Sequence, residues 1–343
     1  VLDLVTNQWN THLLIGWDKT GPTSNSFLWY GNDIVYNNKL LLMGIGGGNT
    51  SYFWWIDLTT FEITLNSSSA ATNIFGNENY GTKVTLYNDI VICFGGTANG
   101  LQDIIIYDII ENKRYIQKTK GSAGKPASRY HHSQHIYNDM LYIFGGQGTT
   151  SQLNDVWTLN LKTFEWIEIS PTGIPPQPRY EHNSVIFKDD LIIIGGHNRS
   201  KHFTDIFKLN LKTNTWSKFN TTFGIRNGYT HVFNNSLITF GGMIDKSNSR
   251  KDVQIMNFYD TLVWKKLDDS TSSTPPYIYH NQMHMHKNKI YMCAGLGEDN
   301  KARTNTYTYD LNTNKWTDIG SDGFGAGRYG YTSVKHNEKI YMF

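Results

Sequence analysis

A diglycine that recurs about every 50 residues is the feature that most constrains the fold of this chain. The copies end apolar runs at Gly46-Gly47, Gly95-Gly96, Gly145-Gly146, Gly195-Gly196 and Gly241-Gly242, with a decayed copy at Gly295-Leu296. A nearly constant period of this length is the signature of a repeat architecture, in which each copy is one supersecondary unit.

Each period contains four short runs that are rich in β-forming residues. In the third copy, residues 129–137 and 140–144 alternate on either side of Asn138-Asp139, and two further runs cover 155–160 and 165–169. Asn-Asp between two alternating runs is typical of a tight hairpin. No long helical pattern intervenes, so the sequence predicts an all-β chain with four antiparallel strands, a to d, in each repeat. The content of 39% hydrophobic and 14% aromatic residues suits packed β-structure and excludes general disorder.

A tryptophan recurs on the same period, well after the diglycine, and in the best copies it stands at Trp166 and Trp216. Four-stranded units of this length, with a diglycine and then a tryptophan, resemble kelch repeats, which build β-propellers. The resemblance covers essentially the whole chain and is strongest in "RYHHSQHIYNDMLYIFGG…NDVWTLNLKTFEW". It implies one kelch propeller that serves as a protein-protein interaction module within a larger multidomain protein.

The two ends of the chain predict seven blades. Residues 328–343 align with 129–144 at a constant offset, and the spacing from Asp3 to Trp9 equals that from Asn160 to Trp166. We therefore expect strands a and b of blade 7 from the C-terminus and strands c and d from the N-terminus, which leaves no open edge. The alternative is a six-bladed ring with fragments of a longer array. The expected blades of the propeller, residues 1–343, are 27–65, 79–117, 129–169, 179–219, 226–267, 278–319, and 328–343 closed by 1–14.

Arginine recurs at the start of strand a. Arg129, Arg179 and Arg328 are in register and Arg226 is one residue off. In a propeller blade this position and the loop between strands b and c lie at the same end, so we expect these arginines to rim the mouth of the central channel. The predicted binding face also includes Tyr130, Tyr180, Tyr329, Arg199, Lys201, Arg250, Lys251 and Arg303.

This face is predicted to bind an acidic or phosphorylated peptide, because guanidinium groups match carboxylates and phosphates with two parallel hydrogen bonds. The alternative is that each arginine bonds carbonyls of the neighbouring blade's loop and closes the ring. Two further classes stay open, an enzyme with a site at the channel mouth and a structural scaffold. An enzyme would need titratable side chains that converge at the mouth.

Other partners and chemistries find little support in the sequence. The net charge of +2 gives no global attraction to nucleic acid, and no apolar run reaches the roughly 18 residues of a membrane span. Cys93 and Cys293 occupy equivalent positions four blades apart, so we expect free thiols and a cytoplasmic location.

Histidine groups at 131, 132 and 135 and at 280, 284 and 286 invite a metal interpretation, but no carboxylate or cysteine stands in a matching position. Pro126 stands where a phosphate-binding loop needs Ser or Thr. We therefore expect no enzyme activity, no catalytic residue, no cofactor and no metal.

Overall fold

The structure of this protein is a computed structural model. It describes residues 1–10, 34–46, 50–65, 81–96, 102–122, 124–219, 229–240, 252–257, 265–267, 275, 278–279, 282–297, 301–321 and 333–342. Within these ranges every regular element is a β-strand, as the alternating runs predict. None of the described residues lies in a helix long and apolar enough to cross a membrane.

The described strands pair as seven antiparallel sheets. Two sheets contain a fifth strand because strand a is split. In blade 3, both β11 (Arg129–Tyr130) and β12 (Ser133–Tyr137) pair with β13 (Met140–Gly148). Seven blades with four antiparallel strands are therefore confirmed, and the alternative of six blades is wrong.

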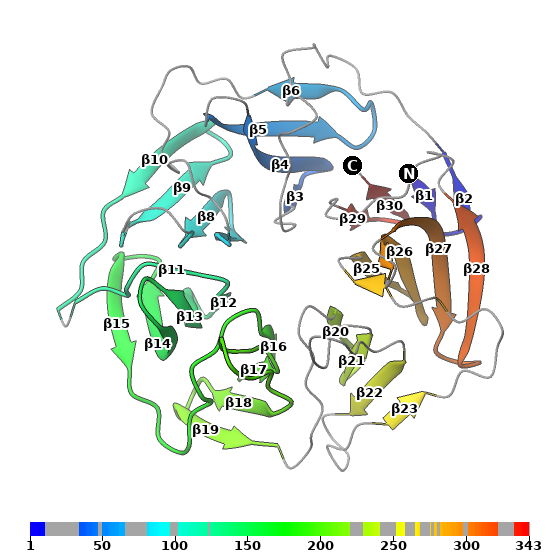
Figure 1. The fold of residues 1–343 in the computed structure, drawn as a ribbon. Coiled ribbons are helices and arrows are strands. Elements are labelled where there is room, and N and C mark those ends of the chain that lie inside the picture. The colour runs from blue at the N-terminus through cyan, green and yellow to red at the C-terminus, as the bar shows by residue number, and fades with distance from the viewer. Residues whose placement is uncertain are drawn as a thin grey trace. The chain divides into compact units, whose positions relative to one another are not determined.

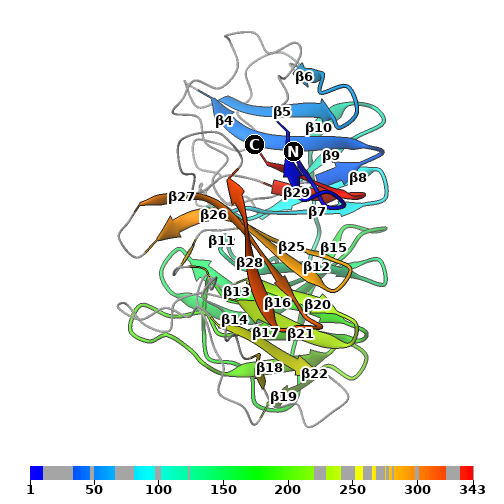
Figure 2. The same cartoon turned by 90° about the vertical axis from the view of Figure 1, so that its right-hand side faces the viewer.

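Contacts along the backbone divide the chain into two compact units. The first consists of Asn49–Ser51 and Ser68–Arg226 and is called here the three-blade unit. Figure 2 shows the strands of its blade 4, β16 to β19, following one another in chain order. Besides β11 to β13, its strands are β7 (Lys83–Tyr87), β8 (Ile90–Phe94), β9 (Ile104–Asp108), β10 (Lys113–Gln117), β14 (Gln152–Asn160), β15 (Glu165–Ile169), β16 (Asn183–Phe187), β17 (Asp190–Ile194), β18 (Ile206–Asn210) and β19 (Thr215–Lys218).

The second, four-blade unit consists of Val1–Gly48, Tyr52–Ser67 and Asn227–Phe343. Its blade 1 contains β3 (Ile34–Tyr36), β4 (Lys39–Gly46), β5 (Thr50–Asp57) and β6 (Ile63–Leu65). Blades 5 and 6 contain β20 (Tyr229–Phe233), β21 (Ser236–Phe240), β22 (Val253–Asn257), β23 (Lys265–Leu267), β24 (Ile278–Tyr279), β25 (Gln282–His286), β26 (Lys289–Gly297), β27 (Ala302–Asp310) and β28 (Lys315–Ser321).

Blade 7 joins the two ends of the chain within the four-blade unit. Strand β1 (Leu2–Asp3) lies between β2 (Gln8–Trp9) and β30 (Lys339–Met342), and β29 (Ser333–His336) completes the sheet. Leu2 is paired with Trp9 on one side and with Ile340 on the other. Figure 1 shows the N- and C-termini close together at this sheet. The predicted split blade is therefore confirmed.

The repeated tryptophans fill the space between neighbouring blades of the same unit. In strand d of blade 3, Trp166 is 1% exposed and lies 5.2 Å from the ring of Phe94, which ends strand b of blade 2. Trp216 has the same relation to Phe144, at 5.3 Å. Each aromatic pair therefore removes apolar surface of two blades from water and fixes one blade on the next.

The diglycine is needed because two chain segments approach closely at this point. Gly95 has a φ of +83°, and a Cβ there would lie 2.4 Å from the carbonyl oxygen of Arg129 in the next blade. The following amide, Gly96 N–H, donates to that same oxygen at 2.9 Å. Only glycine satisfies both the left-handed backbone and the close approach.

The segment after strand d of one blade runs along the outer strand of the next. Thr172 N–H donates to the carbonyl of Asn214 at 2.9 Å, and Trp216 N–H donates to the carbonyl of Thr172 at 2.8 Å. Lys120 makes the same two bonds, with Phe164 and Trp166. These straps satisfy part of the outer edge of blades 3 and 4, which reduces the exposed strand edge.

Gly173→Ala should destabilise the protein, because the strap of blade 4 has no space for a side chain. Gly173 has a φ of +83°, and a Cβ would lie 2.4 Å from the carbonyl oxygen of Trp216. Strain and overpacking together should lower the free energy of unfolding by about 2 kcal/mol or more. Gly124→Ala is the control, since its φ is +106° but no atom lies within 4 Å of the added Cβ. Chemical denaturation measures both variants, and an equal loss in the two would contradict the strap contact.

Candidate functional site

The structure places Arg129 and Arg179 at the start of strand a, as predicted, but it buries their guanidinium groups. Arg129 is 1% exposed and Arg179 is 0% exposed. Arg129 donates to both carboxylate oxygens of Asp155, at 2.6 and 2.7 Å. Arg179 donates in the same way to Asp205, at 2.6 and 3.2 Å.

Nε and Nη1 of each guanidinium also bond to backbone carbonyls. Arg179 Nε donates to the carbonyl of Gln177 at 3.0 Å, and its Nη1 also donates to the carbonyl of Gly195 at 2.8 Å. Arg129 makes the equivalent bonds to Ala127 and Gly145. Each arginine therefore ties strands a, b and c of its own blade together.

These contacts favour a structural role for Arg129 and Arg179 over the predicted role in partner binding, which stays a prediction. A buried guanidinium that is already paired with a carboxylate is poorly placed to bind an acidic peptide. The alternative is also modified, because the guanidinium bonds stay within one blade. The link to the preceding blade comes instead from the backbone, where Gly146 N–H donates to the carbonyl of Arg179 at 2.9 Å.

The aspartates that pair with the arginines were not among the predicted site residues, although the sequence carries a signal for them. The separation from Arg129 to Asp155 is the same as that from Arg179 to Asp205. Arg226 and Asp252 are separated by the same interval. A charge pair repeated at a fixed distance across copies of one unit indicates a structural ion pair in each copy.

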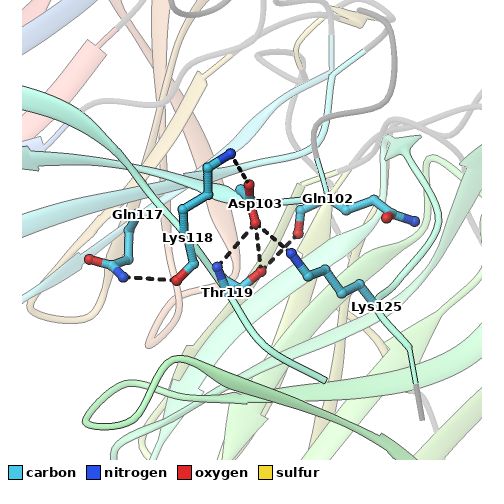
Figure 3. Close-up of polar contacts among 6 residues, drawn as sticks. All are labelled: Gln102, Asp103, Gln117, Lys118, Thr119 and Lys125. Atoms are coloured by element: carbon cyan, nitrogen blue, oxygen red, sulfur yellow. Dashed lines mark hydrogen bonds and ion pairs between the residues drawn. The ribbon is translucent and has the colours of Figure 1, made fainter. Parts of the chain in front are cut away.

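Blade 2 has no arginine at the start of strand a, and its aspartate has other partners. Figure 3 shows Asp103, the counterpart of Asp155, accepting hydrogen bonds from Lys118 at 2.8 Å and from Lys125 at 2.7 Å. The backbone and side chain of Thr119 both donate to it at 3.0 Å. Partial burial would raise the pKa of Asp103, but these hydrogen bonds outweigh it and hold the pKa well below its usual range. The carboxylate is therefore ionised and fully paired.

Arg199 and Lys201 lie in the b–c loop of blade 4 and are exposed, as predicted. The loop is held by Asn198, whose side-chain oxygen accepts from Ser200 N–H at 3.0 Å and from Lys201 N–H at 2.7 Å. Within the described residues, neither cation forms an ion pair. Below them lies the buried Phe203, whose ring centre is 4.2 Å from the guanidinium carbon of Arg179 and 5.7 Å from Lys201 Nζ.

Half-buried aromatic and acidic side chains border this loop. Tyr180 N–H and His197 N–H each bond to the other residue's carbonyl, and their rings lie 4.0 Å apart. Glu181 lies 3.1 Å from Nε2 of His197 and 4.0 Å from Nε2 of His131. Tyr130 and Tyr180 are half-buried, so they keep some surface for a partner and their predicted role in binding stays a prediction.

The backbone of His131 and of Glu181 has the left-handed conformation, which is strained for residues other than glycine. Both have a φ of +53°, where the equivalent residue of blade 2 is Gly81 with a φ of +73°. Glu181 N–H donates to the carbonyl of His131, and His131 N–H donates to that of Gly81. Strained backbone of this kind is concentrated at functional sites. Because the exposed Arg199 and Lys201 lie nearby, we take this end of the three-blade unit as the candidate functional site.

The other predicted binding residues are not all placed by the structure. Arg303 is half-buried in β27, opposite Gly295, and belongs to the four-blade unit. The remaining predicted residues, Arg226, Arg250, Lys251, Arg328 and Tyr329, lie outside the described residues.

The structure offers no support for metal chemistry in the part of the chain that it describes. No three His, Cys, Asp or Glu side chains there are arranged to hold a metal ion. The neighbouring histidines have separate partners: His135 bonds to Ser184 at 2.8 Å, while His132 packs on the ring of Phe94. Burial lowers the pKa of His132 well below its usual value, so its imidazole is neutral.

Neither Cys93 nor Cys293 forms a disulfide, and both are buried. Cys93 pairs with Val84 and Ile105 in the middle of blade 2, and burial raises the pKa of its thiol to about 12. A thiol that stays protonated is a poor nucleophile and a poor metal ligand. Cys93 is therefore a packing residue.

Comparison with known proteins decides the family. The model of the KLHDC2/KLHL20/DRC7 Kelch-repeats domain matches residues 32–232, which is more than half of the chain. The chain belongs to the kelch-repeat family. The model of the Attractin/LZTR1 beta-propeller matches residues 149–343, so the two matches together cover residues 32–343 of this kelch propeller.

Relatives of the kelch propeller include Kelch domain-containing protein 10 of Bos taurus and of Homo sapiens. Each is 30% identical over 155 residues, which is 42% of this chain and 34% of that protein. Rho GTPase-activating protein gacHH of Dictyostelium discoideum is 45% identical over 42 residues, which is 12% of this chain and 3% of that protein. The matches thus span about a third of the first relatives' length.

Kelch propellers are generally protein-interaction modules and are generally not enzymes. The coarse function of this kelch propeller follows from its family. The choice of partner depends on the candidate site.

Proposed function

We propose that this kelch propeller is a protein-interaction module that binds an acidic segment of a partner through the b–c loop of blade 4. The observation that carries the proposal is the pair of exposed cations, Arg199 and Lys201, on a turn fixed by Asn198. Guanidinium and ammonium groups without a carboxylate partner bind carboxylate or phosphate groups of another chain.

The neighbouring charges support the choice of this loop. Two other arginines of the unit, Arg129 and Arg179, are already paired with aspartates. The acid next to the loop, Glu181, lies beside His197, so it does not compete for the exposed cations. Tyr130 and Tyr180 supply half-buried aromatic surface at the same end of the blades, which suits the apolar part of a peptide.

The location and the wider architecture stay predictions. Two buried thiols outside any disulfide are compatible with the reducing cytoplasm that we propose. An attached domain in a longer protein is proposed from the kelch resemblance alone.

Reversing both loop charges should abolish most of the binding. For Arg199→Glu with Lys201→Glu, we expect at least tenfold weaker binding of a fluorescein-labelled peptide rich in Glu and Asp, or of its phosphoserine form. The reason is that each lost attraction becomes a repulsion of about 1 kcal/mol, and about 1.4 kcal/mol is tenfold. Fluorescence anisotropy at low and moderate salt measures this, and binding should weaken with salt because exposed charges are screened within about 10 Å at 0.1 M.

Lys113→Glu with Lys218→Glu is the matched control. It changes the net charge by the same amount on exposed positions of outer strands β10 and β19 in the same unit. Both variants should melt at the temperature of the wild type. Equal weakening in the two pairs would show that only net charge matters, and would refute the proposed loop site.

A further inference from the structure

The first strands of blades 2, 3 and 4 lie side by side within the three-blade unit. Strand β12 contacts β7 on one side and β16 on the other. Gln134 Nε2 donates to Thr85 Oγ1 at 2.9 Å, and Nε2 of His135 lies 2.8 Å from Ser184 Oγ. These three strands, joined by polar side chains, are called here the first-strand wall.

The first-strand wall carries one cation and no carboxylate. The sequences of β7, β12 and β16 contain a single Lys or Arg, which is Lys83, and no Asp or Glu. Lys83 is half-buried, and its amino group makes no hydrogen bond or ion pair with any residue that the structure describes. Burial lowers the pKa of Lys83, which is the direction expected for an ammonium group that lacks an acceptor.

The titratable groups around Lys83 do not neutralise it. Burial lowers the pKa of His135 to about 4 and that of His182 well below its usual value, so both imidazoles are uncharged at neutral pH. Three acids that lie within two residues of β12 or β16 in the sequence are engaged elsewhere. Glu181 lies beside His197, Asp139 accepts from Tyr87 and Lys162, and Asp189 accepts from Tyr137 and Lys212.

A charge taken out of bulk water is normally paired with an opposite charge. Since no described side chain supplies that charge, we propose that Lys83 anchors an oxyanion site on the first-strand wall, where it binds the carboxylate of an acidic side chain from the partner peptide. The identity of this occupant rests on the proposed function, whereas the anion site itself rests only on the wall.

Neighbouring groups suit a carboxylate. Side chains alternate along a strand, so Thr85 lies on the same side of β7 as Lys83. Its oxygen already accepts from Gln134, which leaves its own hydroxyl proton free to donate to an anion. Lys83 begins β7, two residues after Gly81, so it lies toward the end of the blades where strand a begins. The b–c loop of blade 4 lies at the same end of its own blade, so one acidic peptide is expected to meet both.

The test compares small anions with a peptide on the full chain. Acetic anhydride labels amines, and mass spectrometry follows the labelling rate of Lys83 relative to Lys113. We expect glutarate and the acidic peptide to slow labelling of Lys83 at least threefold in a saturable manner, with Lys113 unaffected. Both should raise the melting temperature of the wild type and of Lys218→Met but not that of Lys83→Met.

Three results would overturn the proposal. The first is unchanged labelling of Lys83 at saturating glutarate. The second is an equal rise in melting temperature for the wild type and Lys83→Met. The third is protection by inorganic phosphate without protection by glutarate or by the peptide, which would show that the site does not bind a carboxylate. The labelling uses wild-type protein, so it decides the question even if Lys83→Met does not fold. Protection by glutarate together with no binding of the acidic peptide would support the anion site and would refute only the proposed occupant.

Discussion

Arg179→Met should lower the free energy of unfolding by about 3 to 5 kcal/mol, which is the range for breaking a buried ion pair by removal of one partner. The substitution leaves Asp205, whose side chain is 21% exposed, without its guanidinium partner. It also leaves the carbonyls of Gln177 and Gly195 without the donors that they have in the wild type. The affinity for an acidic peptide should change little, because the buried guanidinium faces no ligand.

Lys201→Met is the control for this prediction. It removes an exposed cation of the b–c loop of blade 4. The melting temperature should therefore stay near that of the wild type, while binding of the acidic peptide weakens. Denaturant titration and fluorescence anisotropy on both variants separate the two roles. A stable Arg179→Met protein that has lost peptide binding would restore the role in ligand binding that the sequence predicts for Arg179.

Mild acid should destabilise the protein strongly, because four histidines, two buried and two half-buried, must be neutral in the folded state. Burial lowers the pKa of His135 to about 4 and that of His284 to about 3. It also lowers the pKa of His132 and of His182 well below the usual value. In the unfolded chain these imidazoles have a pKa of about 6.5.

The sign of the effect follows from proton binding. Below about pH 6.5 the unfolded chain binds protons that the folded chain does not, so the free energy of unfolding falls as the pH falls. Each histidine contributes about 1 kcal/mol between pH 6.5 and 5.5, so the four together remove about 4 kcal/mol in that interval. The carboxylates with lowered pKa values, such as Asp103, act only at lower pH.

Urea unfolding at pH 7.5, 6.5 and 5.5 measures this loss. His135→Gln keeps a hydrogen-bonding group opposite Ser184 and should reduce the loss between pH 6.5 and 5.5 by about 1 kcal/mol. A free energy of unfolding that stays constant from pH 7.5 to 5.5 would contradict the neutral histidines.

The fold could be predicted from the sequence because its determinants repeat. The diglycine marks a close approach of two backbones, as at Gly95, and the tryptophan marks a contact between blades, as at Trp166. Both constraints act on every copy, so their period reveals the unit. The constant offset of the C-terminal segment reveals the split blade for the same reason, since Leu2 and Ile340 complete a sheet that repeats elsewhere in the chain.

The candidate site could be predicted only in part, because charge alone does not show which cations are already paired. Arg179 and Arg199 are equally cationic in the sequence, yet one is buried against Asp205 and the other is exposed. The repeated spacing of arginine and aspartate would have revealed the pair, but strand alternation does not predict contacts between strands a and c. Lys83 lacks an acidic partner because three strands far apart in the sequence contain no Asp or Glu. No local sequence pattern predicts that.

A double-mutant cycle on Arg179→Met and Asp205→Asn, with peptide affinity measured on the same proteins, is the most direct test of the account. It shows whether the buried arginines stabilise the fold or bind the ligand. We predict a coupling energy of about 2 kcal/mol or more in the free energy of unfolding, within the range for contacting pairs. We also predict a peptide affinity within about twofold of the wild type for every folded variant, because the buried guanidinium faces no ligand. A twofold change is well below the roughly 1.4 kcal/mol that corresponds to tenfold. A coupling energy near zero, together with at least tenfold weaker peptide binding in Arg179→Met, would contradict the structural role of these arginines.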